Sequence, residues 1–368
     1  MKAKDTKPHR IAVALSGGVD SSTVAALLVQ QGHNVSGVMM RLWATHYAGK
    51  WPENRCCSPA AVADARRVCA LLGIPFHLVN LEGEFKARVV DYFCDSYTLG
   101  RTPNPCLACN RHIKFKALLH VAFDLGAEYL ATGHYARVQW GNGNYQLLKG
   151  IDERKDQSYV LYMLGQAELP HLLFPLGQYT KRQVRAMAAE YNLPTADKAE
   201  SQDACFVSDG DYRAFVAQQR PETIRPGPIL DLQGQFLGEH RGVAFYTVGQ
   251  RQGMGIAAPH ALYVLEIDSA RNALIVGPRA ALFRSELLAE EVSFVTGSAP
   301  PQPVSVTAKI RYKAKEAPAT LIPLPGQVAK VVFADPQPAI APGQGVVFYQ
   351  GDNVLGGGVI ASAGPMGV

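Results

Sequence analysis

The sequence has no apolar run that approaches the roughly 20 residues of a membrane-spanning helix. Only residues 11–15 are apolar between the basic segment 1–10 and Ser16, and this run is too short for the core of a secretory signal peptide. The seven cysteines are odd in number and scattered, which argues against a structural disulfide framework. We therefore expect a cytoplasmic protein with no membrane partner, in which any important cysteine pair is catalytic, redox-cycling or metal-binding.

A strong excess of one charge is also lacking. The net charge of +5 on 368 residues permits an acidic partner such as RNA but does not require one. With 48% hydrophobic and 18% charged residues, the composition is typical of a globular protein. The length suffices for two or three domains, each with its own core.

What the sequence does have is a glycine-rich turn at 16–22, between a short apolar strand at 11–15 and a helix at 22–31. The start of a helix after such a turn offers free N–H groups and a positive dipole end to a phosphate. No Gly-x-x-x-x-Gly-Lys-Ser/Thr motif occurs, so the lysine of a Walker loop is missing. The turn instead resembles the PP-loop of ATP pyrophosphatases, which adenylate a substrate and release pyrophosphate. The simpler alternative is an ordinary turn between a strand and a helix.

Strand-like and helical segments alternate from residue 11 to about 205. Strands are expected at 11–15, 35–42, 76–80 and 129–132, and helices at 22–31, 59–72, 85–97, 114–125 and 180–190. This alternation predicts an α/β domain whose parallel sheet is covered on both faces and binds its ligand at the carboxyl ends of the strands. Short alternating strands follow, among them 243–248, 261–267, 273–276, 304–311, 328–333 and 345–349. We therefore predict the sheet domain at 1–211, a small central β domain at 212–283 and a C-terminal β-barrel at 284–368.

Two cysteines, Cys106 and Cys109, follow two prolines in the segment 101–110. We expect them on a stiff loop just before a helix that starts at Lys114, where the helix dipole and nearby cations lower a thiol pKa. By itself the Cys-x-x-Cys spacing fits a redox pair, half of a zinc site, part of an iron–sulfur site or two unreactive thiols. Cys205 stands alone at the end of the α/β region, and a lone cysteine is usually a small core residue.

Several short motifs occur in one order along the chain, at 16–22, 101–110, 114–116, 131–135, 155–159, 201–206, 247–251 and 342–344. Together they resemble, almost motif by motif, the family of bacterial tRNA 2-thiouridylases, from residue 11 to about 360. The resemblance implies a PP-loop domain, a small central β domain and a C-terminal β-barrel. It also implies an ATP-dependent enzyme that replaces the C2 oxygen of the wobble uridine (U34) of tRNA with sulfur.

The resemblance assigns roles to individual residues. Cys109 matches the catalytic nucleophile, and Cys205 matches the cysteine that carries sulfur as a persulfide. ATP, accompanied by magnesium, would be bound by Ala14, Leu15, Ser16, Gly17, Gly18, Val19, Asp20, Ser21, Met40 and Gly133. The target base and the surrounding tRNA would be contacted by Asn104, Pro105, Cys106, His134, Lys155, Asp156, Gln157, Arg311, Tyr312 and Gln344.

These implied roles form a coherent reaction. Adenylation of O2 turns a poor leaving group into AMP, and N–H donors and cations around the phosphates stabilise the developing charge. The persulfide on Cys205 attacks C2, and Cys109 then releases the sulfur, which leaves a Cys109–Cys205 disulfide to be reduced. The implied partners are tRNA of the Lys, Glu and Gln type and a persulfide-donating carrier or cysteine desulfurase, with the enzyme itself a monomer.

One departure from the family bears on the route of the sulfur. Some relatives carry aspartate where this chain has Cys106, as a candidate acid or base beside the reacting uridine. With cysteine there, Cys106, Cys109 and Cys205 could instead hold a [4Fe–4S] cluster with one open iron, a route that we rank below the persulfide. Two other functions stay open: a different PP-loop ligase that adenylates another substrate, and an RNA-binding module whose nucleotide loop is regulatory.

Overall fold

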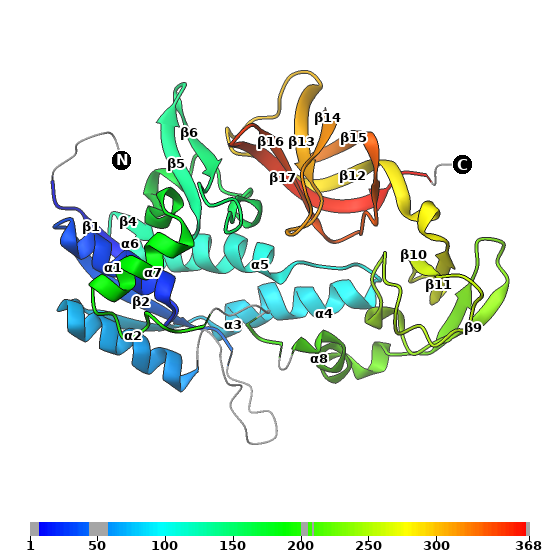
Figure 1. Ribbon diagram of the computed structural model, residues 1–368, viewed down its shortest axis with the longest axis horizontal. Helices are drawn as coiled ribbons and strands as arrows, with labels where there is room; N and C mark the ends of the chain where they lie inside the picture. Colours follow the sequence, from blue (N-terminus) through cyan, green and yellow to red (C-terminus); the bar gives the residue numbers. More distant parts are fainter. Residues whose placement is uncertain (1–6, 44–57, 200–204, 208–209, 366–368) are drawn as a thin grey trace.

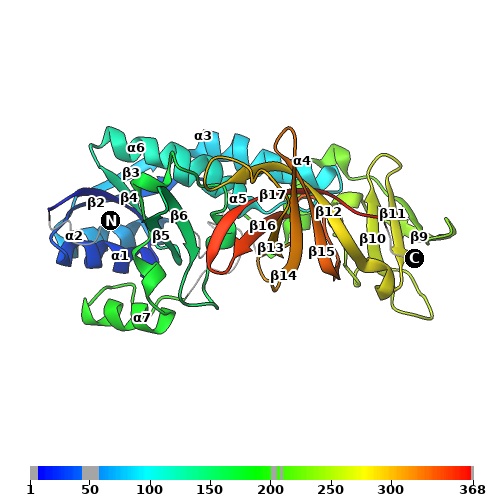
Figure 2. The same ribbon diagram turned by 90° about the horizontal axis from the view of Figure 1, so that it is seen from above.

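The computed structural model describes residues 7–43, 58–199, 205–207 and 210–365 (Figure 1). Residues 201–204, part of the predicted motif around Cys205, lie outside these described residues. Figures 1 and 2 show the N-terminal sheet and the sheet of the central domain at opposite ends of an elongated molecule, with a barrel between them. Within the described ranges, no helix is both long and apolar enough to cross a lipid bilayer.

The N-terminal sheet is parallel throughout, in the order β3-β2-β1-β4-β7. Its strands are β1 (Arg10–Leu15), β2 (Asn34–Arg41), β3 (Phe76–Asn80), β4 (Tyr129–Ala131) and β7 (Leu172–Leu173). Alternate residues of β1 face opposite sides of the sheet. Ile11 and Val13 pack with residues of α1 (Val19–Gln30), α2 (Pro59–Leu72) and α7 (Lys181–Glu190), whereas Ala12 packs with residues of α6 (Leu118–Asp124). The predicted sheet with helices on both faces is confirmed.

Capping residues explain why two of these helices could be located from the sequence. The Ser58 hydroxyl accepts a hydrogen bond from the backbone N–H of Ala61 at 3.1 Å, and Gly73 ends α2 with a φ of +66°. Thr180 and Gln183 form a reciprocal capping box at the start of α7. Both helices therefore begin and end where the sequence predicts.

Two long helices of mixed type connect the N-terminal sheet to the rest of the molecule (Figure 1). In the first, α3 (Glu82–Phe85), the π-helical η1 (Lys86–Val90) and α4 (Asp91–Thr98) follow without a break. In the second, α5 (Pro105–Ala108), the π-helical η2 (Cys109–Ala117) and α6 do the same. The prediction that the cysteines precede a helix starting at Lys114 is wrong, because the helix already begins at Pro105 and contains both cysteines.

The central domain contains α8 (Tyr212–Gln219) and a sheet in the order β10-β11-β8-β9. Its strands are β8 (Gly227–Leu230), β9 (Phe236–His240), β10 (Tyr263–Asp268) and β11 (Ala273–Gly277). Strands β10 and β11 lie close to their predicted positions. The strand predicted at 243–248 is wrong, since η8 (Val243–Phe245) is a turn of 3-10 helix, and α8 is a helix where we expected β structure.

The C-terminal domain is a closed barrel. Its strands are β12 (Phe283–Phe294), β13 (Val304–Lys309), β14 (Ala317–Leu324), β15 (Val328–Pro338), β16 (Gly345–Gln350) and β17 (Asn353–Ala363), in the order β12-β15-β14-β13-β16-β17, with β12 also paired to β17. The predicted barrel is therefore confirmed. A hairpin of the N-terminal domain, β5 (Ala136–Gly141) and β6 (Asn144–Lys149), extends this sheet through a pairing of Leu148 with Asn353. The sequence analysis did not anticipate that hairpin.

Candidate active site

The strand order of the N-terminal sheet locates the site. The sheet grows outward from β1 in two directions, through β2 on one side and β4 on the other. The loops that leave β1 and β4 therefore diverge, and ligands of open parallel sheets bind in the crevice formed at such a point. The glycine-rich turn follows β1 and Gly133 follows β4, so two predicted nucleotide-binding segments meet there.

The turn after β1 is fixed by its own hydroxyl groups. The Ser21 Oγ accepts a hydrogen bond from the Ser16 N–H at 3.2 Å, and the Ser22 Oγ donates to the Gly18 carbonyl at 2.8 Å. Helix α1 starts at Val19, three residues earlier than predicted, and its N-cap residue Gly18 has no side chain to accept from the first N–H groups. The first backbone N–H groups of α1 are therefore available to bind an anion.

Two glycines allow close approaches around the turn. Gly17 has a φ of +68°, and an added Cβ would lie 2.5 Å from the Ala61 carbonyl oxygen of α2. At Gly133 an added Cβ would lie 3.1 Å from both the Asp20 Cβ and the Ser21 N. The turns after β1 and β4 are therefore packed directly against each other and against α2.

The predicted nucleotide residues all lie at one edge of the sheet. Residues 14–21 end β1 and begin α1, and Met40 lies near the carboxyl end of β2. Met40 is half-buried and packs against two different core clusters, one of which contains the cysteine region. Met40 therefore links the sheet edge that carries the predicted nucleotide residues to the cluster that contains Cys109 and Cys205.

Asp20, inside the turn, is engaged by groups that the sequence analysis missed. The Lys181 Nζ lies 2.7 Å from each Asp20 carboxylate oxygen, and the Tyr135 hydroxyl donates to Asp20 at 2.9 Å. Lys181 is the first residue of α7, and a lysine after a helix cap carries no sequence signal for such a contact. The pair fixes α7 to the phosphate-binding turn.

Cys109 and Cys205 belong to one packed cluster, although 95 residues separate them along the chain. Cys109 is buried in that cluster, and Cys205 is half-buried against it. Phe206 anchors the Cys205 segment, with ring centroids 5.2 Å from Phe93 and 5.3 Å from Phe215. Cys109 also opens the π-helical η2, a local irregularity that is frequent at functional sites.

Cys106 differs from Cys109 in its surroundings. The residue as a whole is exposed, although protein atoms surround its thiol, while Asn104 caps the helix by accepting from the Cys106 N–H at 3.0 Å and Pro105 occupies the first turn. The protein atoms around it raise the pKa of the Cys106 thiol, and the charge of Lys114 opposes that shift. The lowered pKa that we predicted for this cysteine is wrong, because desolvation outweighs the nearby cation.

The segment leading to the cysteines is held by both β domains. The Gln344 side chain donates to the Thr102 carbonyl at 2.8 Å, and the Thr102 hydroxyl donates to the Thr247 hydroxyl at 3.2 Å. Arg101 forms an ion pair with Glu290 at 2.8 Å. Gln344, predicted to lie near tRNA, therefore positions the approach to Cys106 and Cys109.

Three predicted tRNA contacts lie in the loop before η3 (Ser158–Val160). The Asp156 carboxylate accepts from the Ser158 N–H at 3.1 Å and from its hydroxyl at 2.8 Å. The Gln157 side chain accepts from the Tyr135 N–H at 3.0 Å. These two side chains stabilise the loop, and Lys155 is half-buried beside them.

The barrel contributes a further side of the site. The Tyr312 hydroxyl donates to the Asp156 carbonyl oxygen at 3.4 Å. Burial raises the pKa of Tyr312, and the charge of Asp156 acts in the same direction. The barrel also packs against the cysteine helix, since an added Cβ at Gly345 of β16 would lie 2.8 Å from the Leu107 Cδ1 of α5. Arg311 is exposed and donates to the Pro338 carbonyl at 3.1 Å.

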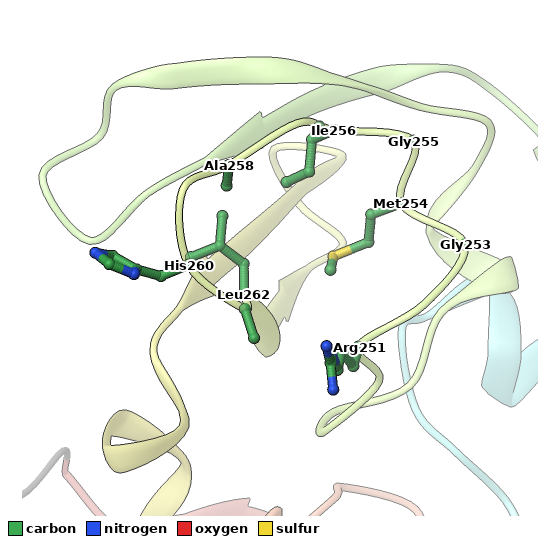
Figure 3. Close-up of a pocket in the computed structure, with 9 residues that line it drawn as sticks. Arg251, Gly253, Met254, Gly255, Ile256, Ala258, His260 and Leu262 are labelled. Atoms are coloured by element: carbon green, nitrogen blue, oxygen red, sulfur yellow. The ribbon is translucent and has the colours of Figure 1, made fainter.

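One hollow in the surface is unrelated to this chemistry. A pocket of about 200 Å³ in the central domain is formed by a single loop, residues 251–262, and is lined by Arg251, Met254, His260 and Leu262 among others (Figure 3). None of the predicted site residues lines it. The candidate active site is therefore the switch point of the parallel sheet, where the predicted nucleotide-binding segments lie, and not this pocket.

Comparison with known proteins identifies the family. The families described as "tRNA methyl transferase HUP domain", "tRNA methyl transferase PRC-barrel domain" and "Aminomethyltransferase beta-barrel domain" match residues 9–209, 213–278 and 284–360. A protein of Roseiflexus castenholzii named tRNA-specific 2-thiouridylase MnmA is 50% identical, covering 96% of this chain and 99% of its own. A protein of Chloroflexus aurantiacus with the same name is 52% identical, covering 95% of this chain and 98% of its own. This chain belongs to the tRNA-specific 2-thiouridylase family.

Likeness to solved structures is weaker. A 4-thiouridine synthetase in complex with RNA and ATP is 18% identical, with a TM-score of 0.35, and the match covers 58% of this chain and 51% of the other. This similarity is too distant to carry a functional argument, and membership in the 2-thiouridylase family rests on the sequence relatives.

His134 is a predicted tRNA contact of this 2-thiouridylase family member that lies inside the protein. Its ring is buried between Phe115 and Phe174, and its Nδ1 lies 2.7 Å from the Thr132 hydroxyl. Burial, with a smaller effect of the Lys114 charge, holds the pKa of His134 well below its usual value. This environment favours the neutral form of His134, which supports the carboxyl end of β4, and its contact with tRNA stays a prediction.

We expect His134 to make stability depend on pH. Its pKa is lower in the folded chain than in the unfolded chain, so its contribution is complete above about pH 6.5 and is lost as the pH falls below that value. The free energy of unfolding should fall by up to about 1.4 kcal/mol per pH unit in that range because of this one group. Urea unfolding between about pH 5 and 7 measures this slope, and His134→Gln should flatten it. An unchanged slope in the variant would contradict the expectation.

Proposed function

We propose that this chain is a tRNA-uridine 2-sulfurtransferase, which uses ATP to replace the C2 oxygen of the wobble uridine with sulfur. Relatives at 50% and 52% identity over nearly the full chain carry the name tRNA-specific 2-thiouridylase. The observation that carries the proposal is that Cys109 and Cys205 share one packed cluster with Met40, at the edge of the sheet where the nucleotide turn lies. An enzyme that only adenylates has no need of two thiols beside that edge.

The first step is adenylation. The uridine O2 attacks the α-phosphorus of ATP, a new O2–phosphorus bond forms, and the bond to the β-phosphate oxygen breaks to release pyrophosphate. The N–H groups at the start of α1 and the hydroxyls of Ser16 and Ser21 would hold the phosphates, with magnesium bound to them. Met40 and Gly133 would line the adenosine.

The second step is sulfur transfer. The terminal sulfur of a persulfide on Cys205 attacks C2, and AMP leaves with the former O2. The Cys109 thiolate then attacks the Cys205 sulfur and breaks the S–S bond, so the sulfur stays on the uridine and a Cys109–Cys205 disulfide forms. An external thiol reductant regenerates both cysteines, and a sulfur carrier or cysteine desulfurase reloads Cys205.

The remaining predicted residues would position the tRNA. Asn104, Pro105 and Cys106 would contact the target base; they lie at the start of α5, where Cys106 is exposed and the other two are half-buried. Lys155, Asp156, Gln157, Arg311 and Tyr312 would contact the tRNA, with His134 and Gln344 close by. We propose a monomer with domains at 1–211, 212–283 and 284–368, acting on tRNA of the Lys, Glu and Gln type.

An iron–sulfur route would need three converging thiols. Among the described residues, no three His, Cys, Asp or Glu side chains form a group that could hold a metal ion. Cys106 is exposed, whereas Cys109 is buried in the cluster. The thiols in this arrangement do not fit a [4Fe–4S] cluster, and the proposed route therefore uses Cys109 and Cys205 alone.

The word methyltransferase in the family descriptions names a different reaction. Mass spectrometry of the tRNA nucleosides distinguishes the two. Incubation with ATP, a persulfide donor and unmodified tRNA should give 2-thiouridine at the wobble position, together with equal amounts of AMP and pyrophosphate. Turnover with an amino acid and no tRNA would instead favour another PP-loop ligase.

A further inference from the structure

A lysine from far along the chain reaches the phosphate-binding turn. The Lys198 Nζ donates to the Gly17 carbonyl oxygen at 2.9 Å and to the Asp64 carboxylate at 2.7 Å. A lysine ammonium has three N–H groups, of which these contacts use two. The Lys198 side chain as a whole is 36% exposed, so part of it remains open to solvent beside the turn.

The charge around Lys198 stays positive. Asp64 is shared with Arg67, whose guanidinium lies 3.4 Å from the other carboxylate oxygen. Two cations therefore face one carboxylate, and the group as a whole carries a net charge of about +1. Lys181, on the other side of the turn, differs because both oxygens of Asp20 are paired with its ammonium.

Adenylation at the phosphate-binding turn would be favoured by a cation beside the phosphates. The sequence has no Walker lysine, yet the leaving pyrophosphate gains negative charge as the bond from the α-phosphorus to the β-phosphate oxygen breaks. A lysine is a common point-charge partner of phosphate. Lys198 comes from outside the motif, 181 residues beyond Gly17, and sequence spacing gives no hint of it.

We propose that Lys198 is the phosphate-binding lysine of this site and contacts the β- and γ-phosphates, the part of ATP that departs as pyrophosphate. The inference rests on the proposed function, because it assumes that the turn binds ATP. Asp64 is a positioning residue that holds the Lys198 ammonium against Gly17.

Equilibrium binding to the full chain tests this role with a series of ligands. Lys198→Met should weaken binding of ATP and of inorganic pyrophosphate about 10- to 100-fold, the effect of losing a charged hydrogen bond. Binding of adenosine and AMP should change by less than about two-fold, since neither carries the β- and γ-phosphates. Lys198→Arg, which keeps the charge, should recover most of the ATP affinity and serves also if the Met variant folds poorly.

Lys330→Met is the matched control. Lys330 is another half-exposed lysine paired with a carboxylate, Glu286, at 2.6 Å, but it lies on the barrel. This variant should bind all four ligands as the wild type does. Unchanged ATP and pyrophosphate affinity in Lys198→Met would overturn the proposal, as would an equal loss for adenosine, which would indicate a distorted turn.

The 2-thiouridine assay and the ATP-binding measurement distinguish failure of the proposed function from failure of the role of Lys198. If the wild type binds ATP but forms no 2-thiouridine with tRNA and a persulfide donor, the sulfurtransferase assignment fails and the Lys198 result still stands. If the wild type forms 2-thiouridine and Lys198→Met binds ATP normally, only the role of Lys198 is refuted.

Discussion

Replacing Cys109 or Cys205 with serine should reduce 2-thiouridine formation at least about a thousand-fold while leaving ATP affinity within about two-fold of the wild type. A serine hydroxyl can neither carry sulfane sulfur nor form a disulfide, so each substitution removes a group that the transfer requires. Because the two thiols act in one step, the double variant should be no less active than either single variant. Mass spectrometry of tRNA nucleosides and equilibrium ATP binding measure the two quantities.

The cluster itself supplies the matched control. Cys94 lies in the same packed group as Cys109, and burial raises the pKa of its thiol to about 11, so it stays protonated and unreactive. Cys94→Ser should therefore retain thiolation within about three-fold. Substantial thiolation by Cys109→Ser would contradict the proposed transfer, and complete loss in Cys106→Ala would favour the iron–sulfur route instead.

Gly17→Ala should be the most damaging single change in the phosphate-binding turn. The left-handed backbone costs an alanine about 1–2 kcal/mol, and the contact with the Ala61 carbonyl adds about 1–3 kcal/mol. The free energy of unfolding should thus fall by about 2–5 kcal/mol, and ATP affinity by at least about ten-fold as the turn shifts. Urea unfolding and ATP titration measure these effects.

Gly73 provides a control with almost the same backbone. Its φ is +66° against +68° at Gly17, but an added Cβ there meets nothing within 4 Å. Gly73→Ala should therefore cost only the backbone term of about 1–2 kcal/mol and leave ATP binding unchanged. If the two variants lost equal stability, the close approach to Ala61 would not matter.

Local signals explain how much of the fold could be predicted. Ser58 and Gly73 mark the ends of α2, and Thr180 marks the start of α7, because caps are short-range features. The β5–β6 hairpin was missed although its turn, Asn142-Gly143 with both φ angles positive, is a strong local hairpin signal. Only its pairing with β17, about 200 residues away, leaves no local pattern. The helix from Pro105 was missed because prolines at 103 and 105 suggested a loop, although proline is well tolerated in a first helical turn.

The candidate site likewise contains residues that could be predicted from local sequence and residues that could not. Residues 14–21 and Gly133 are predictable because the turn chemistry is local to each strand end. Lys181 and Lys198 are not, since each is an ordinary lysine whose importance comes only from the packing of distant segments onto the turn. The pKa of Cys106 was misjudged for the same reason: sequence shows the neighbouring Lys114 but not the desolvation.

Because Leu148 of β6 pairs with Asn353 of β17, the edge of the N-terminal hairpin is covered only when the barrel is present. A fragment that ended before the barrel would expose the bare edge of β6 together with the surface that Gln344 and Glu290 now cover. Such a fragment invites self-association through its open strand. The N-terminal domain therefore depends on the barrel to cover this edge.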